Sequence, residues 1–187
     1  MVQTSTKPMT LAAFLELPET EPASEFIDGK VTQKPMPKGK HSRLQTKLSN
    51  VLNDFLEAEK TGLALTELRC SFGGAVVVPD VVVLQSSRIP RDADGDIADI
   101  VEVAPDLTIE ILSPGQSQTK VIKKISHCLK GGSELGWLID PSERTVLVFR
   151  PDEAIVILEA VEASLPMPKV LSSVNLTVGI LFGWLQV

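Results

Sequence analysis

The stretch Ala75–Leu84 reads AVVVPDVVVL and places Pro79 and Asp80 inside an almost unbroken run of valines. Such a run is typical of a strand that is covered on both faces of a sheet. Pro79 has no backbone N–H to donate, so the sequence predicts a bulge or a break in pairing there. A buried carboxylate is costly unless it is paired or bound to a metal. Asp80 is therefore a candidate metal ligand, and the alternatives are a strand-end cap or an ion pair with an arginine.

Glu110 occupies a comparable position in the next apolar segment, Leu107–Leu112 (LTIEIL). Side chains alternate between the two faces of a strand, so Glu110 shares a face with Thr108 and Leu112. In one interpretation this face is exposed to solvent. The apolar neighbours and the stop at Ser113-Pro114 instead favour a central strand, where a glutamate needs a partner.

A helix predicted over Gln116–Leu129 carries Lys124 at the border of its apolar stripe. The stripe consists of Val121, Ile125, Cys128 and Leu129. One interpretation is that the Lys124 stem packs while its amine reaches solvent. The other is that the amine points towards Asp80 and Glu110.

The remaining segments predict helices and strands in a mixed order. Helices are expected over Leu11–Leu17 and 41–60, and Val178–Leu185 is either a helix or a strand. Strands are expected over Glu25–Val31 (a hairpin turning at Asp28-Gly29), Leu63–Ser71, Leu135–Ile139, Thr145–Phe149 and Ala154–Val161, with a loop over 85–105. This order lacks repeating βα units, and the sequence has no Gly-rich phosphate loop. The fold class is α/β (α+β), a mixed β-sheet flanked by helices.

Length and composition are typical of one globular domain. The chain has 187 residues and is 43% hydrophobic and 22% charged. We expect a disordered lead over 1–9 and a single domain over 10–187. No apolar run reaches the roughly 18 residues of a membrane helix, and the N-terminus lacks the apolar region of a signal peptide. We therefore expect a cytoplasmic protein with no membrane partner, in which Cys70 and Cys128 are reduced core residues.

The net charge of −6 argues against nucleic-acid binding by bulk electrostatics. Six Phe, two Trp and no Tyr also give no indication of a base-stacking platform. Neither observation excludes a nuclease, because a metal site needs only local carboxylates.

Asp80, Glu110 and Lys124 together fit the chemistry of a phosphodiesterase. Two carboxylates supply hard oxygen ligands for Mg²⁺ or Mn²⁺. Such a metal activates water and offsets the charge that builds on the phosphate. A lysine beside it could orient or deprotonate the water, or stabilise the transition state.

The sequence also resembles the Uma-type family of putative endonucleases, formerly classed as a domain of unknown function and related to PD-(D/E)XK restriction endonucleases. The resemblance runs from about Leu11 to Phe149. The pieces that carry it are EFIDGKV at 25–31, His41, VPDVVVL at 78–84, PDLTIEILSP at 105–114, the helix with Lys124, and LGWLIDPSERTVLVFRP at 135–151.

The resemblance implies a restriction-endonuclease-like core that cuts DNA rather than RNA with Mg²⁺ or Mn²⁺, as a homodimer. Asp80 and Glu110 match the two acids of the motif and would hold the metal. The motif's lysine, two residues after the second acid, is replaced by Leu112, and Lys124 matches the lysine that the family supplies from the following helix. Two accessory positions also match: Glu25 as an outer metal ligand, and His41 as a contact to phosphate or water, with helix capping as the alternative.

The sequence departs from the family pattern in two places. Lys120 replaces a frequent acid, and Cys128 replaces a frequent tyrosine. Neither departure changes the three central positions.

Two further hypotheses compete with a DNA endonuclease. One is a catalytically silent nuclease-fold module for binding or assembly, which the acidic pI favours. The other is a protein–protein module that uses an exposed apolar C-terminal patch with Leu181, Phe182 and Trp184. The position of the Lys124 amine distinguishes the first two, because the enzyme requires it to point at the carboxylates.

Overall fold

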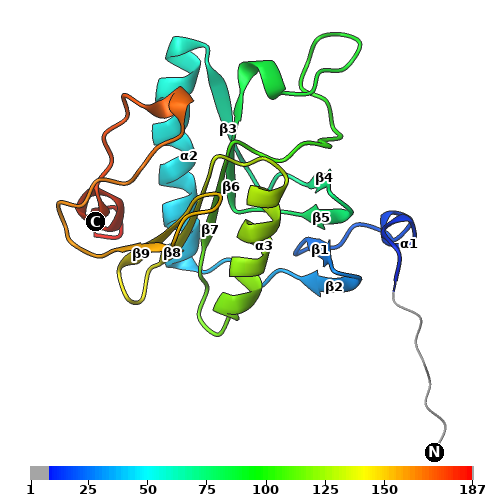
Figure 1. Cartoon of the computed structure of the whole chain (residues 1–187), viewed down its shortest axis with the longest axis horizontal. Coiled ribbons are helices and arrows are strands. Elements are labelled where there is room, and N and C mark those ends of the chain that lie inside the picture. Colours follow the sequence, from blue (N-terminus) through cyan, green and yellow to red (C-terminus); the bar gives the residue numbers. More distant parts are fainter. Residues whose placement is uncertain (1–8, 187) are drawn as a thin grey trace, which may run out of the picture.

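The computed structural model describes residues 9–186, which form two β-sheets with helices packed against them (Figure 1). The expected disordered lead over 1–9 therefore lies outside the described residues except for Met9, and the single domain over 10–187 stays a prediction. Among the described helices, none is both long enough and apolar enough to cross a membrane.

The larger sheet has six strands in the order β10-β9-β8-β7-β6-β3. β7 and β8 run parallel, and the other neighbours run antiparallel. The strands are β3 (Gly62–Thr66), β6 (Val81–Gln85), β7 (Leu107–Ile111), β8 (Leu135–Asp140), β9 (Thr145–Phe149) and β10 (Val156–Leu158). Helix α2 (Gly39–Glu59) covers one face and α3 (Gln118–Lys130) the other, so β7 is buried on both sides.

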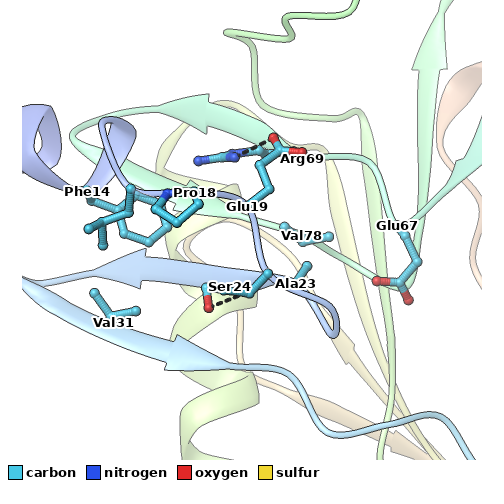
Figure 2. Close-up of a pocket in the computed structure, with 11 residues that line it drawn as sticks. Phe14, Pro18, Glu19, Ala23, Ser24, Val31, Glu67, Arg69 and Val78 are labelled. Carbon is cyan, nitrogen blue, oxygen red and sulfur yellow. Dashed lines mark hydrogen bonds and ion pairs between the residues drawn. The ribbon is translucent and has the colours of Figure 1, made fainter.

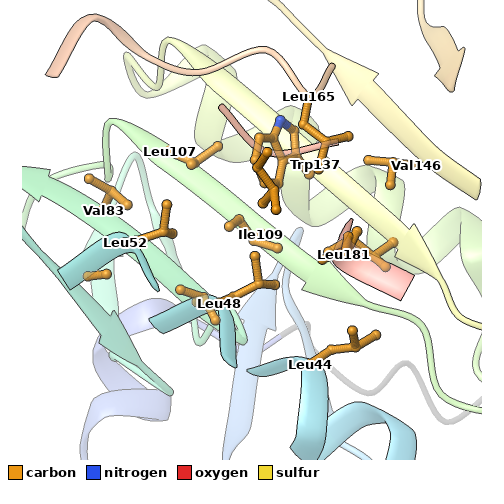
Figure 3. Packing of buried hydrophobic residues seen from close by; sticks show 14 of the residues in the cluster. Leu44, Leu48, Leu52, Val83, Leu107, Ile109, Trp137, Val146, Leu165 and Leu181 are labelled. Atoms are coloured by element: carbon orange, nitrogen blue, oxygen red, sulfur yellow. The ribbon is translucent and has the colours of Figure 1, made fainter. Parts of the chain in front are cut away.

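The main core lies between α2 and the larger sheet (Figure 3). Leu44, Leu48 and Leu52 recur along one side of α2 and are fully buried. They belong to one cluster with Ile109 of β7 and Trp137 of β8. Each buried leucine contributes about 2 kcal/mol of hydrophobic stabilisation, so the amphipathic pattern of α2 fixes this helix on the sheet.

On the opposite face, Gly136 allows α3 to approach β8 closely. A Cβ atom at Gly136 would lie 2.4 Å from Cγ2 of Ile125 on α3, so a larger residue would force the helix away. This contact helps to set the height of α3, and with it Lys124, above the sheet.

The smaller sheet has the order β2-β1-β5-β4. Its strands are β1 (Ser24–Ile27), β2 (Lys30–Gln33), β4 (Cys70–Phe72) and β5 (Ala75–Val77). The predicted turn between β1 and β2 is confirmed, because Asp28 and Gly29 have φ values of 52° and 73°. Helix α1 (Leu11–Leu15) packs Phe14 against Phe26 of β1.

The chain passes between the two sheets at two neighbouring places, from β3 to β4 and from β5 to β6. β3 pairs with β6 in the larger sheet, whereas β4 pairs with β5 in the smaller sheet. At the crossing, the N–H of Glu67 donates to the Asp80 carbonyl at 3.3 Å. The break predicted at Pro79 is confirmed. The continuous strand predicted over Leu63–Ser71 is wrong, because the chain bends at Glu67, which has a φ of 51°.

Most other predicted elements are confirmed within a few residues. The undecided segment at 178–185 contains the short helix α4 (Val178–Gly183), and the loop at 85–105 begins with a 3₁₀ turn, Ser86–Arg88. The proposed exposed C-terminal patch is wrong, because Leu181 and Phe182 pack into the main core and are 0% and 2% exposed. Cys70 and Cys128 are buried and unlinked, as predicted.

Candidate active site

Asp80 and Glu110 face each other where β6 begins. Val81 pairs with Ile109, so the next position of this antiparallel register brings Asp80 opposite Glu110, with both side chains on one face. The N–H of Ile111 donates to Asp80 Oδ2 at 2.7 Å and ties the carboxylate to β7. Asp80 is 2% exposed and Glu110 is 1% exposed. The interpretation of Glu110 as a surface residue is therefore wrong.

Glu25, Glu110 and Lys124 form what we call the inner group. The Lys124 amine lies 2.8 Å from Glu110 Oε2 and 2.8 Å from Glu25 Oε1. Glu25 Oε1 also accepts the N–H of Val78 at 2.8 Å. Lys124 is 3% exposed, so its amine points at the carboxylates and not at solvent. Glu110 Oε1 is buried and has no hydrogen-bond partner among the described residues.

Lys34, Glu67 and His41 form an outer group around Asp80. The Lys34 amine donates to Asp80 Oδ1 at 2.7 Å, Glu67 Oε2 at 2.6 Å and the Val78 carbonyl at 2.8 Å. No sequence pattern indicates Lys34 or Glu67 as site residues. Lys34 is one of several lysines in a Pro-rich loop, and Glu67 follows an ordinary strand, so only the crossing of the strands brings them together.

His41 contacts Asp80 from the first turn of α2. Its Nε2 lies 3.5 Å from Asp80 Oδ1, and its Nδ1 lies 3.2 Å from Ser113 Oγ. The N-cap of α2 is Lys38, so the alternative role of His41 as a helix cap is wrong. Ser113, which the sequence marks only as a strand stop, holds the ring in place.

The pKa values of the two central carboxyl groups shift in opposite directions. Burial alone would raise the pKa of Asp80, but the hydrogen bond with His41 and the charge of Lys34 lower it below the usual range. Burial raises the pKa of Glu110 to about 8, against the opposing effect of Lys124, with a further increase from Asp80. The pKa of Lys124 is raised, because its carboxylate partners outweigh the desolvation that would lower it. Lys124 is therefore a cation at neutral pH.

Two overlapping groups of side chains could hold a metal ion. Ligand atoms of His41, Glu67 and Asp80 all lie within 4.8 Å of one another. The pair of ligands predicted from the sequence is instead Asp80 with Glu110. The unpartnered Glu110 Oε1 fits that second pair, because a buried carboxylate oxygen otherwise needs a donor or a cation. Asp80 is common to both groups, and carboxylates suit Mg²⁺ or Mn²⁺.

Two clefts open onto these groups. The main cleft, about 770 Å³, is lined by Lys34, His41, Glu67 and Asp80 together with the loop 19–23. The α3 cleft, about 350 Å³, is lined by the inner residues Glu25 and Lys124 and by the loop 114–117. Lys34 and Gln116 line both clefts. Substrate could therefore reach the carboxylates from either side of Lys34.

A smaller side pocket of about 280 Å³ continues from the main cleft towards α1. Figure 2 shows Phe14 and Pro18 at one end of it and Glu67 at the other. Arg69 and Glu19 form an ion pair of 2.7 Å across its rim.

Comparisons with known proteins identify relatives of the chain. Residues 11–179 match the model of the Uma2 family, described as "Putative restriction endonuclease". The chain is also similar to a protein of known structure, with 52% sequence identity. That structure is described as the crystal structure of a putative nuclease belonging to DUF820 from Anabaena variabilis ATCC 29413 at 1.96 Å resolution. The match covers 95% of this chain and 99% of that chain, with a TM-score of 0.93. No curated protein matches. The predicted family and fold class are confirmed.

Proposed function

Because the chain belongs to the Uma2 family of putative restriction endonucleases, we propose that it is a metal-dependent endonuclease that hydrolyses DNA phosphodiester bonds. The observation that carries the proposal is the meeting of Asp80 and Glu110 at the break between the sheets, with the Lys124 amine 2.8 Å from Glu110. In this proposal Asp80 and Glu110 hold Mg²⁺ or Mn²⁺, which would activate water and offset charge on the phosphate.

Lys124 acts in the proposal as a fixed positive charge. Its raised pKa favours donation of a hydrogen bond to the attacking water or the phosphate over removal of a proton. Glu25 holds the amine in place through its 2.8 Å ion pair, which gives Glu25 a positioning role in place of direct metal binding. His41 would orient Asp80 and contact the phosphate at the floor of the main cleft.

The distribution of charge supports a nucleic-acid substrate despite the acidic total. Residues 29–53 and 111–133 contain no Asp or Glu and supply ten of the 18 lysines and arginines of the chain. These two segments contribute Lys34 to both clefts and Lys120 to the α3 cleft. The main cleft is also lined by Glu19 and Glu21, which lie outside these two segments. A phosphate chain is therefore expected to follow the α3 side.

Three further features complete the proposal. The substrate is DNA in preference to RNA, as the family description suggests. The active form is a homodimer, because two sites can cut two strands. The protein acts in the cytoplasm. Light scattering of the purified protein tests the dimer, and parallel digests of DNA and RNA test the substrate.

The deciding experiment is a calorimetric titration of Mn²⁺ and Mg²⁺ into the wild type and Asp80→Asn, with plasmid nicking on the same samples. A matched control is Asp106→Asn. Asp106 is 1% exposed and pairs with Arg88 just before β7, about 13 Å along the strand from Glu110. We expect metal binding and nicking to be lost in Asp80→Asn and retained in Asp106→Asn. Wild-type protein that binds no metal would instead be a catalytically silent nuclease-fold module.

A further inference from the structure

The Lys34 amine is held by a shell made only of oxygen atoms. Its partners are the Asp80 and Glu67 carboxylates and the Val78 carbonyl, at 2.7, 2.6 and 2.8 Å. These contacts satisfy all three donors of the ammonium group. Two carboxylates and a backbone carbonyl are also the ligands that a divalent cation such as Mg²⁺ prefers.

The ammonium group and a metal would compete for the same oxygen atom. Asp80 Oδ2 already accepts the N–H of Ile111 at 2.7 Å, whereas Oδ1 is the atom bound by Lys34. Oδ1 is also the Asp80 atom nearest to His41, at 3.5 Å. A divalent ion on Oδ1 would lie within a few ångströms of the ammonium group and repel it strongly in this buried setting.

Lys34 also has more room to leave its position than Lys124, which lines only the α3 cleft. Lys34 follows β2 at the start of a loop in which residues 35–38 are exposed, and it lines both clefts. Its partner Glu67 has a side chain that is 44% exposed. Lys124 is instead on α3, and its partner Glu110 has a side chain that is 1% exposed.

We propose that the Lys34 ammonium is an exchangeable occupant of the cation position on Asp80, and that a divalent metal binds there by displacing it into the clefts. This inference rests on the proposed function, in which Asp80 binds a divalent metal. It adds a role for Lys34 that no sequence motif assigns. Once displaced, Lys34 stays tethered at the junction of both clefts, where its charge can contact the substrate phosphate.

Amine labelling with mass spectrometry tests this on the wild-type protein. With saturating Mn²⁺, we expect labelling of Lys34 to rise several-fold, because its side chain, 7% exposed, would move into the clefts. Lys124 should stay protected, and the exposed Lys38 and Lys40 are internal controls whose labelling should not change. Unchanged or lower labelling of Lys34 at saturating Mn²⁺ would overturn the proposal.

Calorimetric titration of Mn²⁺ into Lys34→Met provides an independent measurement, with Lys40→Met as the control for loss of a nearby positive charge. An internal competitor reduces the apparent affinity to the intrinsic affinity multiplied by the fraction of molecules in which the site is free. We therefore expect roughly tenfold tighter binding to Lys34→Met. Lys40→Met should bind like the wild type. Equal or weaker binding to Lys34→Met, with wild-type binding intact, overturns only the role of Lys34. No binding to either protein overturns the metal dependence as well.

Discussion

Lys124 and Lys34 each bridge two carboxylates of one site, but they do so from different kinds of structure. Lys124 projects from the middle of α3 into the inner group, where its partners Glu25 and Glu110 have side chains 10% and 1% exposed. Lys34 reaches in from a loop, and its partners Asp80 and Glu67 have side chains 3% and 44% exposed. The inner group is therefore built into the packing of α3 on the sheet, whereas the outer group can rearrange when ligands bind.

The largest expected effect is on catalysis, from Glu110→Gln. This change removes a proposed metal ligand of the inner group, and we expect nicking to fall by about a thousandfold. The free energy of unfolding should fall far less than in Lys124→Met, because Gln has the shape of Glu and burial already disfavours the charged form of Glu110. Plasmid nicking and urea unfolding measure the two quantities.

Glu67→Gln is the matched change in the outer group. It should reduce nicking only several-fold, because Glu67 contacts Lys34 from the cleft wall. If Glu67→Gln abolished nicking and Glu110→Gln did not, the order of importance of the two groups would be reversed.

A second prediction compares the lysines by stability. Lys124→Met leaves two buried carboxyl groups without their cation, and we expect the free energy of unfolding to fall by about 3 kcal/mol. Lys34→Met should cost less, about 1–2 kcal/mol, because the exposed Glu67 can turn to solvent and the buried Asp80 keeps the Ile111 N–H and His41 as partners. Urea unfolding of both variants at pH 7 provides the measurement, and equal losses would contradict the distinction between the groups.

A third prediction concerns proton release from Glu110. Its pKa is raised to about 8, so below that pH the metal must displace a proton from this carboxyl group. Mn²⁺ affinity should therefore rise with pH up to about 8, by at most about tenfold per pH unit, and level off above it. Calorimetry at pH 7 in buffers of different ionisation enthalpy should show close to one proton released per metal. Binding without proton release would show that Glu110 is not a ligand.

The smallest expected effect is that of Ser113→Ala. The hydroxyl group contacts His41 Nδ1 at 3.2 Å, and its loss should lower the free energy of unfolding by about 1 kcal/mol. Metal affinity should change by less than about twofold, because the N–H of Ile111 still fixes the Asp80 carboxylate in the absence of the Ser113 hydroxyl. A large loss of Mn²⁺ affinity in this variant would mean that the orientation of His41 controls the metal site.

The sequence predicts the inner group better than the outer group for a physical reason. Glu110 and Lys124 lie in regular elements, so the alternation of a strand and the apolar stripe of a helix indicate which way each side chain points. Pro79 indicates the break between β5 and β6, because proline has no N–H to donate to a neighbouring strand. Lys34 and Glu67 lie in a loop and at a bend, where local patterns fix no direction.

The errors in the predicted fold have a similar origin. The strand expected over Leu63–Ser71 is interrupted because the segment it pairs with, Ala75–Gln85, is itself broken at Pro79. The residues of Leu63–Ser71 do not show which segment they pair with, so their own pattern does not predict the bend. The competing hypothesis of an exposed apolar patch with Leu181 and Phe182 fails because these residues pack into the main core with the leucines of α2.

The central claim is that Asp80 and Glu110 hold one metal ion, and anomalous scattering from Mn²⁺-soaked crystals tests it most directly. We expect a manganese peak in contact with a carboxylate oxygen of each residue, with the Lys34 amine displaced from Asp80 Oδ1. Absence of a peak at saturating Mn²⁺, or a peak held by His41 and Glu67 without Glu110, would contradict it.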